Sequence, residues 1–156
     1  GDLWLEIPAL GVRRAITGVP RQAEGWDVTW LGDLAGYLEG TAFPTWKGNS
    51  VITGHVVVAS GLPGPFARLG QLEYGDAVFV HAWGERYHYE VRQVSVVKPS
   101  DSSIFRHEAR AWVTLVTCQG YDPKSDTYRE RRVVRAVLME VDGEAVSAPP
   151  AMERGR

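Results

Sequence analysis

The sequence predicts an all-β domain, either a closed barrel or a sandwich. Its apolar stretches are short, rich in β-branched residues and separated by turns that contain Gly or Pro. Seven or eight such stretches follow one another, and no helical segments alternate with them as they would in a βαβ protein. With 156 residues and a 44% hydrophobic composition, the chain fits one domain with a substantial core.

The first half of the chain contains three of these stretches. Strands are expected at residues 2–8, 12–19 and 51–58. Residues 20–48 are rich in Gly and Trp but weakly periodic, so they should form loops with at most a short helix around 22–26. Residues 66–69 fit a single helical turn.

The second half has a clearer pattern. Strands are expected at residues 77–83, 86–97, 112–118 and 131–141. Gly84-Glu85 should form the hairpin loop between the first two, and residues 100–108 a polar loop with a short helical turn. The domain should span residues 1–141, and a flexible tail rich in Pro, Ala and Glu should follow over 142–156.

Charge and cysteine content exclude several classes of function. The formal net charge is −2, which argues against a nucleic-acid binder that depends on a basic surface. The single cysteine, Cys118, excludes an internal disulfide and a Cys-rich metal site, and no phosphate-binding motif is present, so we expect no metal and no cofactor. No apolar run approaches the roughly 18 residues of a membrane span. The chain is therefore either an enzyme whose chemistry depends on Cys118 or a protein without catalytic activity.

Cys118 and His55 are the candidate nucleophile and base. Cys118 ends an apolar strand beside a glycine turn, where substrate could reach its sulfur, although an unpaired cysteine is also a common core residue. A nucleophilic cysteine needs a base or a positive charge nearby. His55 follows Gly54, which would let another backbone or a ligand approach closely, but it could equally be a core histidine.

The other three histidines carry less weight as candidates. His81 and His88 should lie across their hairpin as a solvated pair, and His107 sits in a charged loop that we expect at the surface.

Arg131 is the candidate for binding a carbonyl oxygen. It follows Cys118 by 13 residues across a turn-rich connection, and its forked donors suit a carbonyl or an oxyanion. Arg129, Arg132 and Arg135 are alternatives, and all four could instead form a basic stripe on an edge strand. Because successive strand residues alternate faces, Arg131 and Arg132 should point to opposite sides.

Three segments resemble the sortases, the cysteine transpeptidases of bacterial cell surfaces. Thr114-Leu115-Val116-Thr117-Cys118 matches their TLxTC motif, and Ile52-Thr53-Gly54-His55 resembles the strand that carries their histidine. Residues 128–134 resemble the strand that carries their arginine, and the family's spacing from the cysteine favours Arg131. Residues 5–8 and 69–76 are also similar, so the resemblance covers roughly residues 5–141.

The resemblance implies an eight-stranded sortase-type β-barrel with short helices in the connections, in which His55, Cys118 and Arg131 meet in a groove. In that family the cysteine attacks the Thr–Gly bond of an LPxTG-like C-terminal sorting signal and forms a thioacyl enzyme. An amine from a cell-wall precursor or a pilin lysine then resolves it. The resemblance implies that His55 serves as acid and base, that Arg131 holds the substrate carbonyl and that Thr117 binds substrate.

The same resemblance implies partners and a location. The partners would be surface proteins that carry the sorting signal, together with the amine acceptor. Sortases work at the extracellular face of the bacterial membrane through an N-terminal anchor, and we interpret its absence from this sequence as trimming. The carboxylates that calcium-dependent members carry before the histidine are not evident in residues 43–47, so we expect no calcium dependence.

Three other classes of cysteine enzyme and one class of binding protein are alternatives to a sortase. An L,D-transpeptidase also places His before Cys, but it uses a Ser-His-Gly-Cys-type motif that is absent here. Papain-like hydrolases reverse the order of the two residues, and caspases have a different motif and an α/β fold. A non-catalytic β-barrel that binds at a surface, with an inert core cysteine, remains the alternative from another class. A thiol-labelling assay at neutral pH separates it from an enzyme.

Overall fold

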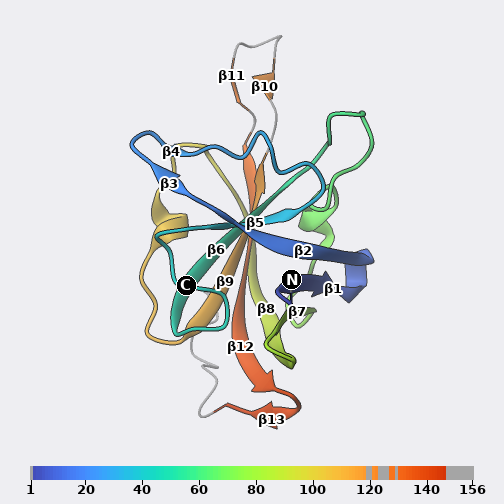
Figure 1. Cartoon of the computed structure of the whole chain (residues 1–156), viewed down its shortest axis with the longest axis vertical. Helices are drawn as coiled ribbons and strands as arrows, with labels where there is room; N and C mark the ends of the chain where they lie inside the picture. The colour runs from blue at the N-terminus through green and yellow to red at the C-terminus, as the bar shows by residue number, and fades with distance from the viewer. Residues whose placement is uncertain (1, 119–120, 123–126, 129, 147–156) are drawn as a thin grey trace.

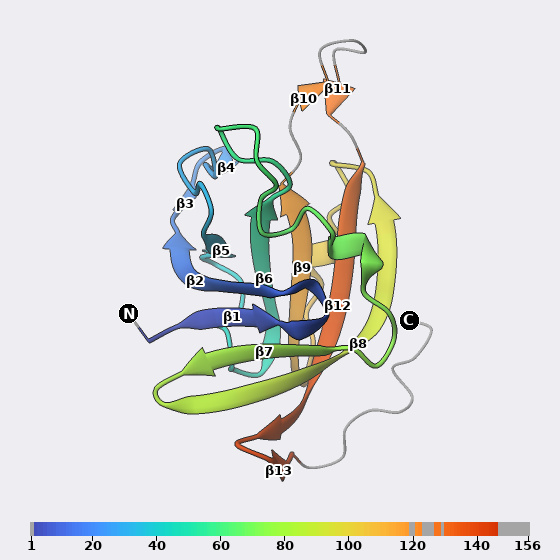
Figure 2. The ribbon, with the colours of Figure 1, turned by 90° about the vertical axis from the view of Figure 1, so that its right-hand side faces the viewer.

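The computed structural model describes residues 2–118, 121–122, 127–128 and 130–146, and these form an all-β domain (Figures 1 and 2). The strands of the main sheet are β1 (Trp4–Ile7), β2 (Val12–Val19), β5 (Ala35–Leu38), β6 (Gly48–His55), β7 (Ala77–Ala82), β8 (Glu85–Val97), β9 (Ala111–Cys118), β12 (Arg131–Val141) and β13 (Glu144–Ala145). Two small hairpins add β3 (Arg21–Gln22) with β4 (Gly25–Trp26), and β10 (Tyr121–Asp122) with β11 (Thr127–Tyr128).

The main sheet closes on itself. Its strand order runs β13-β12-β8-β7-β1-β2-β5-β6-β9, and β9 pairs back with β12. Eight of the described strands, from β12 round to β9, therefore complete a barrel, and β13 extends β12 outside the ring. The prediction of an all-β, eight-stranded barrel is confirmed.

Most pairs in the ring are antiparallel, but two are parallel: β2 with β5, and β6 with β9. Connections that contain short 3₁₀ helices link the strands: η1 (Pro8–Leu10), η2 (Leu69–Gln71) and η3 (Ser103–Phe105). None of the helices in the described part of the chain is long and apolar enough to cross a membrane.

Strand alternation gives the sheet two apolar sides. Odd-numbered residues of β9 such as Val113 and Leu115 point into the barrel, where they pack with Ile52, Val80 and Val134. The even-numbered Val116 instead faces a second cluster on the outside of the sheet, which consists of Val19, Leu31, Leu38, Val51, Ile104, Val116 and Val133. We call this set the outer cluster. Apolar side chains on both faces explain why β9 is a nearly continuous hydrophobic run.

The structure differs from the sequence prediction in the segment 20–48. The short helix expected around residues 22–26 is wrong, because β3 and β4 form a small hairpin there. β5 was not predicted. It pairs with β2 and β6. Its four residues include Gly36, which Val19 and Leu31 pack against so closely that a Cβ would come within 2.8 Å and 2.9 Å of them.

Several predicted element boundaries also shift. The run expected as a strand to Val58 leaves the sheet after His55, and Val57 is exposed. The hairpin loop is Trp83-Gly84 rather than Gly84-Glu85, since Ala82 pairs with Glu85 and both loop residues have positive φ, as in a type I′ turn. The C-terminal tail was expected from residue 142, but the chain first turns back to form β13, and residues 147–156 lie outside the described part.

Candidate active site

The ends of β6 and β9 bring His55 and Cys118 together. These two parallel strands pair over eight consecutive positions, from Gly48 opposite Ala111 to His55 opposite Cys118. Both strands therefore end level at the same rim of the barrel, at the upper end of the molecule in Figure 2. Parallel pairing is what allows residues from distant parts of the sequence to meet at the carboxyl ends of neighbouring strands.

β12 brings Arg131 to the same level on the other side of β9. The antiparallel register pairs Val133 with Val116. If this register is continued by two residues, backward along β12 and forward along β9, position 131 lies opposite position 118. The N–H of Arg132 donates to Oγ1 of Thr117 at 2.9 Å, which continues the contact between the strands beyond the last paired residues.

Alternation assigns these positions to faces. His55 lies four residues from Val51, and Arg131 lies two residues from Val133, so both share the face of the outer cluster. Cys118 occupies the corresponding position of β9, two residues after Val116. Arg131 is half-buried.

Arg132 falls on the opposite face. Its side chain there lies against η2, so closely that a Cβ on Gly70 would come within 2.6 Å of its Nε. Arg129 lies outside the described residues. Arg135 is buried in an ion pair with Glu108 further down the sheet.

His55 is held by a main-chain contact that the sequence did not reveal. Its Nε2 lies 2.9 Å from the carbonyl oxygen of Val28, in the connection between β4 and β5. A carbonyl oxygen can only accept, so Nε2 carries the proton and Nδ1 is left as the acceptor nitrogen of the neutral ring. His55 is half-buried.

Gly54 does stand at a close approach, but side chains approach it rather than the backbone or ligand that the sequence suggested. A Cβ on Gly54 would come within 3.2 Å of the rings of Phe66 and Pro65. Gly64 lies against the main chain of His55 itself, where a Cβ would come within 2.2 Å of the carbonyl oxygen. The residues that follow β6 therefore pack closely against the end of the strand that carries His55.

Two connections cover the outer cluster beside these strand ends. Leu31 comes from the β4–β5 connection and Ile104 from the β8–β9 connection, and both are buried in the cluster. The second connection also contacts the end of β4, because Trp26 of β4 stacks on Phe105 with ring centroids 5.3 Å apart.

Thr117 is buried, and the contact that the structure gives to its hydroxyl is the N–H of Arg132. It also lies on the face opposite His55, because it is one residue away from the Cys118 position. Substrate binding by Thr117 therefore stays a prediction, and the geometry shows a part for this side chain in joining β9 to β12.

The remaining histidines lie elsewhere, and the expected pairing of two of them is wrong. His81 contacts Glu6 at 3.0 Å and stacks on Trp4, whereas His88 contacts Glu140 at 3.1 Å. They are not cross-strand partners, because His88 stands opposite Phe79 and His81 opposite Arg86. His107 is exposed, as expected.

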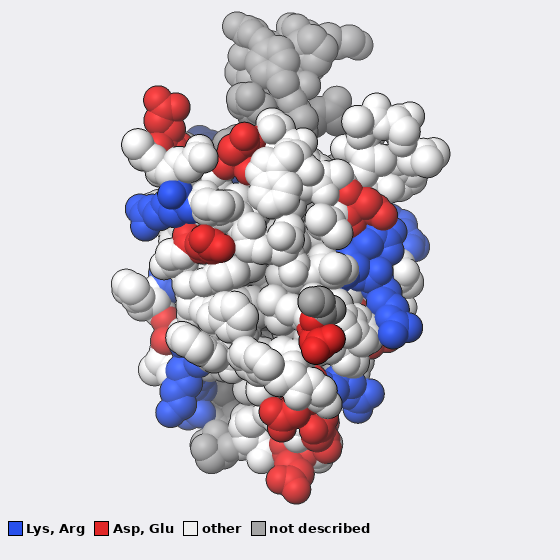
Figure 3. All heavy atoms as spheres, in the orientation of Figure 1, with Lys and Arg blue, Asp and Glu red and all other residues white. Residues whose placement is uncertain are grey.

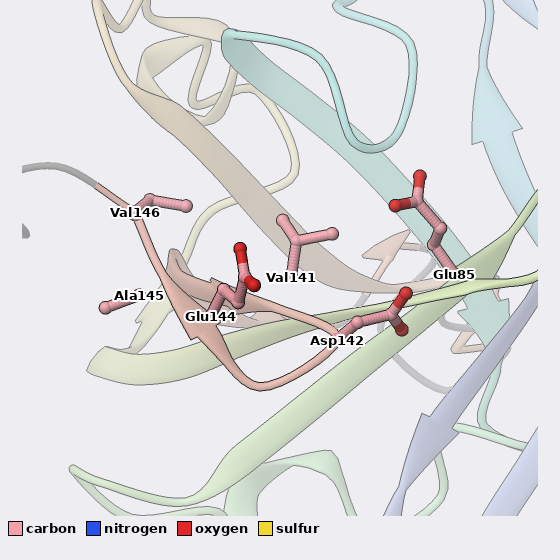
Figure 4. A pocket seen from close by; sticks show the side chains of 6 residues that line it. All are labelled: Glu85, Val141, Asp142, Glu144, Ala145 and Val146. Atoms are coloured by element: carbon pink, nitrogen blue, oxygen red, sulfur yellow. The ribbon is translucent and has the colours of Figure 1, made fainter.

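An acidic hollow lies at the far end of the barrel from His55. It has a volume of about 470 Å³ and is lined by Glu85, Val141, Asp142, Glu144, Ala145 and Val146 (Figure 4). Figure 3 shows acidic side chains gathered at this lower end, whereas both signs of charge occur along the flanks. Among the described residues, no group of three or more His, Cys, Asp or Glu side chains could hold a metal ion.

Comparisons with known proteins identify the family and the fold. The sortase domain family matches residues 5–139. Sortase A from Corynebacterium diphtheriae, solved as a lid mutant, is 28% identical, with a TM-score of 0.73 over 91% of this chain and 72% of that chain. Sortase C-1 from Actinomyces oris is 31% identical, with a TM-score of 0.70 over 88% of this chain and 73% of that chain.

A third similar structure is the sortase D5 transpeptidase of Clostridium perfringens, which is 25% identical, with a TM-score of 0.69 over 90% of this chain and 79% of that chain. No curated protein sequence matches this chain. A closed barrel with cysteine and histidine at one rim, together with these similarities, defines a cysteine transpeptidase. The chain belongs to the sortase family, whose members act at the bacterial cell surface. The similar structures include sortases A, C and D, so they do not select one class.

Proposed function

We propose that this sortase cleaves an LPxTG-like C-terminal sorting signal through Cys118 and transfers the freed acyl group to an amine. The observation that supports this most directly is the register of β6 and β9, which sets His55 opposite Cys118 at the rim of the barrel. Arg131 supports it further, because its position on β12 is level with Cys118 on the same face.

In the proposed first step, the Cys118 thiolate attacks the carbonyl carbon of the Thr residue in the signal and forms a carbon–sulfur bond. The carbonyl oxygen takes up negative charge, which the guanidinium of Arg131 stabilises by charge-assisted hydrogen bonds. Collapse of this intermediate breaks the Thr–Gly carbon–nitrogen bond. The protonated His55 gives a proton to the departing amine, and a thioacyl enzyme remains.

The second step reverses these roles with a different amine. The acceptor nitrogen attacks the thioacyl carbon and loses a proton to His55, and the carbon–sulfur bond breaks. The thiolate and the protonated imidazole are thereby regenerated, so the cycle needs no oxidant, metal or cofactor. The acceptor is an amine of a cell-wall precursor or of a pilin lysine. We place the enzyme at the extracellular face of the bacterial membrane, where surface proteins with the signal would reach it.

The test is to incubate the protein with a panel of LPxTG-like peptides, with and without candidate amines, and to identify products by mass. We expect ligated peptide with an amine present, and an acyl adduct on the intact protein without one. Cys118→Ala should form neither product while keeping its fold by circular dichroism. Turnover by the Cys118→Ala variant would end the enzymatic assignment of this residue.

A further inference from the structure

We propose that the connection between β4 and β5 is a positioning element for the acid–base histidine: the Val28 carbonyl fixes the proton on Nε2, so that Nδ1 exchanges protons in the reaction. Asp27 is the positioning residue that holds this carbonyl in place. The inference rests on the role proposed above for His55, but its main measurement does not depend on turnover.

The contact between His55 and Val28 has the geometry of a full hydrogen bond. The distance from His55 Nε2 to the Val28 oxygen is 2.9 Å, a normal length for an N–H···O hydrogen bond. The N–H of Leu31 also donates to this oxygen, at 3.2 Å. With two donors from different directions, the carbonyl oxygen has both lone pairs engaged and a defined orientation.

A side chain closes the turn around Val28. Oδ1 of Asp27 accepts from the backbone N–H of Thr29 at 3.0 Å and from its hydroxyl at 2.6 Å. Asp27 and Thr29 therefore bracket Val28 and limit rotation of the peptide that carries the carbonyl. These hydrogen bonds also lower the pKa of Asp27, so the carboxylate that accepts them is ionised at neutral pH.

The chain is anchored on both sides of this turn. Trp26 donates from Nε1 to the Glu39 carbonyl at 2.9 Å and stacks on Phe105. Leu31 is buried in the outer cluster, next to the strands that carry the site. The ribbon in Figure 2 shows β3, β4 and the start of this connection at the same end of the barrel as the ends of β6 and β9.

The chemical consequence concerns which nitrogen is available. While Nε2–H is bound to a carbonyl, only Nδ1 can accept a proton from the thiol or the acceptor amine and later return one. A ring that switched freely between tautomers would present the acceptor nitrogen at the site for only part of the time. The fixed carbonyl therefore raises the population of the competent tautomer without touching the substrate.

The decisive experiment is ¹⁵N NMR on protein labelled at histidine, at a pH where the His55 ring is neutral. The wild-type spectrum should show Nε2 protonated and Nδ1 as the unprotonated nitrogen of His55, assigned by its loss in His55→Ala. A spectrum with Nδ1 protonated and Nε2 bare would overturn the inference outright.

The variants test the part played by Asp27. Asp27→Ala should give a mixture of His55 tautomers and lower kcat about tenfold with little change in KM, since a lost hydrogen bond of ordinary strength corresponds to a change of this order. Asp27→Asn keeps an Oδ1 acceptor for the Thr29 N–H and should restore most of the wild-type tautomer. Asp33→Ala removes an exposed carboxylate of the same connection, which pairs with Arg14, and serves as the matched control.

The outcomes are separable from those of the proposed function. If Asp27→Ala leaves both the tautomer and kcat at wild-type values, Asp27 has no positioning role. If no peptide is turned over but Nε2 is protonated, the proposed substrate class fails and the tautomer assignment is supported. A fall in kcat for Asp33→Ala equal to that for Asp27→Ala would show that any change in the connection matters, and would overturn the specific role of Asp27.

Discussion

His55 stands directly opposite Cys118 in the parallel pairing of β6 and β9. Seven further pairs fix this register, and a shift of one residue would move the histidine to the inner face of the barrel. Val51 lies four residues before His55, and Val116 lies two residues before Cys118. Both valines are buried in the outer cluster, and their packing stabilises this register. The site is therefore a consequence of how the two strands pack.

The first prediction concerns the choice among the histidines. His55→Ala should lower kcat/KM by about 10²- to 10⁴-fold, the range that general acid–base catalysis usually contributes. His81→Ala, His88→Ala and His107→Ala should retain activity, because these rings contact Glu6, contact Glu140 and lie at the surface, respectively. Peptide ligation assays measure all four. An inactive His81 or His88 variant beside an active His55 variant would contradict the assignment.

The second prediction concerns Arg131 and Arg132. Arg131→Lys should stay severely impaired, because lysine keeps the charge but loses the forked donors that hold a carbonyl oxygen. Arg132→Ala should be nearly silent in the same assay, since this side chain lies on the other face against η2. If Arg132→Ala abolishes ligation and Arg131→Ala does not, the register of β12 at the site is wrong by one residue.

Much of this arrangement could be predicted from the sequence because it depends on local patterns. The TLxTC segment, the apolar strand before His55 and the alternation along β12 all led to the barrel and the three candidate residues. β5 and the β3–β4 hairpin were missed, because strands of two to four residues carry too little periodicity to stand out. The contact between His55 and the Val28 carbonyl was not predictable, since it joins a side chain to a main-chain atom 27 residues away.

The third prediction concerns stability beneath the site. Glu108 and Arg135 form an ion pair at 2.6 Å with their side chains 4% and 3% exposed, and the guanidinium also lies over the Trp112 ring, 4.4 Å from its centroid. Glu108→Ala removes the carboxylate that Arg135 contacts at 2.6 Å in a buried site, so it should lower the free energy of unfolding by about 3–5 kcal/mol. Urea unfolding followed by circular dichroism measures this change.

The control for this prediction is an ion pair at the surface. Asp33 and Arg14 lie 2.9 Å apart, but the Asp33 side chain is 59% exposed. Asp33→Ala should therefore change the free energy of unfolding by no more than about 1 kcal/mol. Equal losses for Glu108→Ala and Asp33→Ala would show that burial does not govern the Glu108–Arg135 pair.

The last prediction concerns alkaline pH and Tyr89, the one fully buried tyrosine among the described residues. Burial raises the pKa of Tyr89 well above its ordinary value of 10, because the phenolate would lose its hydration inside the barrel. The unfolded chain loses this proton near pH 10 while the folded chain keeps it. The stability that the neutral phenol contributes is thus fully present below pH 10 and falls as the pH rises toward the folded-state pKa, by up to about 1.4 kcal/mol per pH unit.

Tyr89→Phe separates this effect from simple packing. The variant should be about 1 kcal/mol less stable near pH 8, because the backbone N–H of Thr45 loses the phenolic oxygen that it reaches at 3.2 Å. Between pH 10 and 12 its free energy of unfolding should fall less steeply than that of the wild type. The reason is that the variant lacks the buried Tyr89 phenol, which ionises more readily in the unfolded chain than in the folded one. Identical slopes for Tyr89→Phe and the wild type in urea titrations across this range would show that Tyr89 ionises in the folded protein as readily as in the unfolded chain.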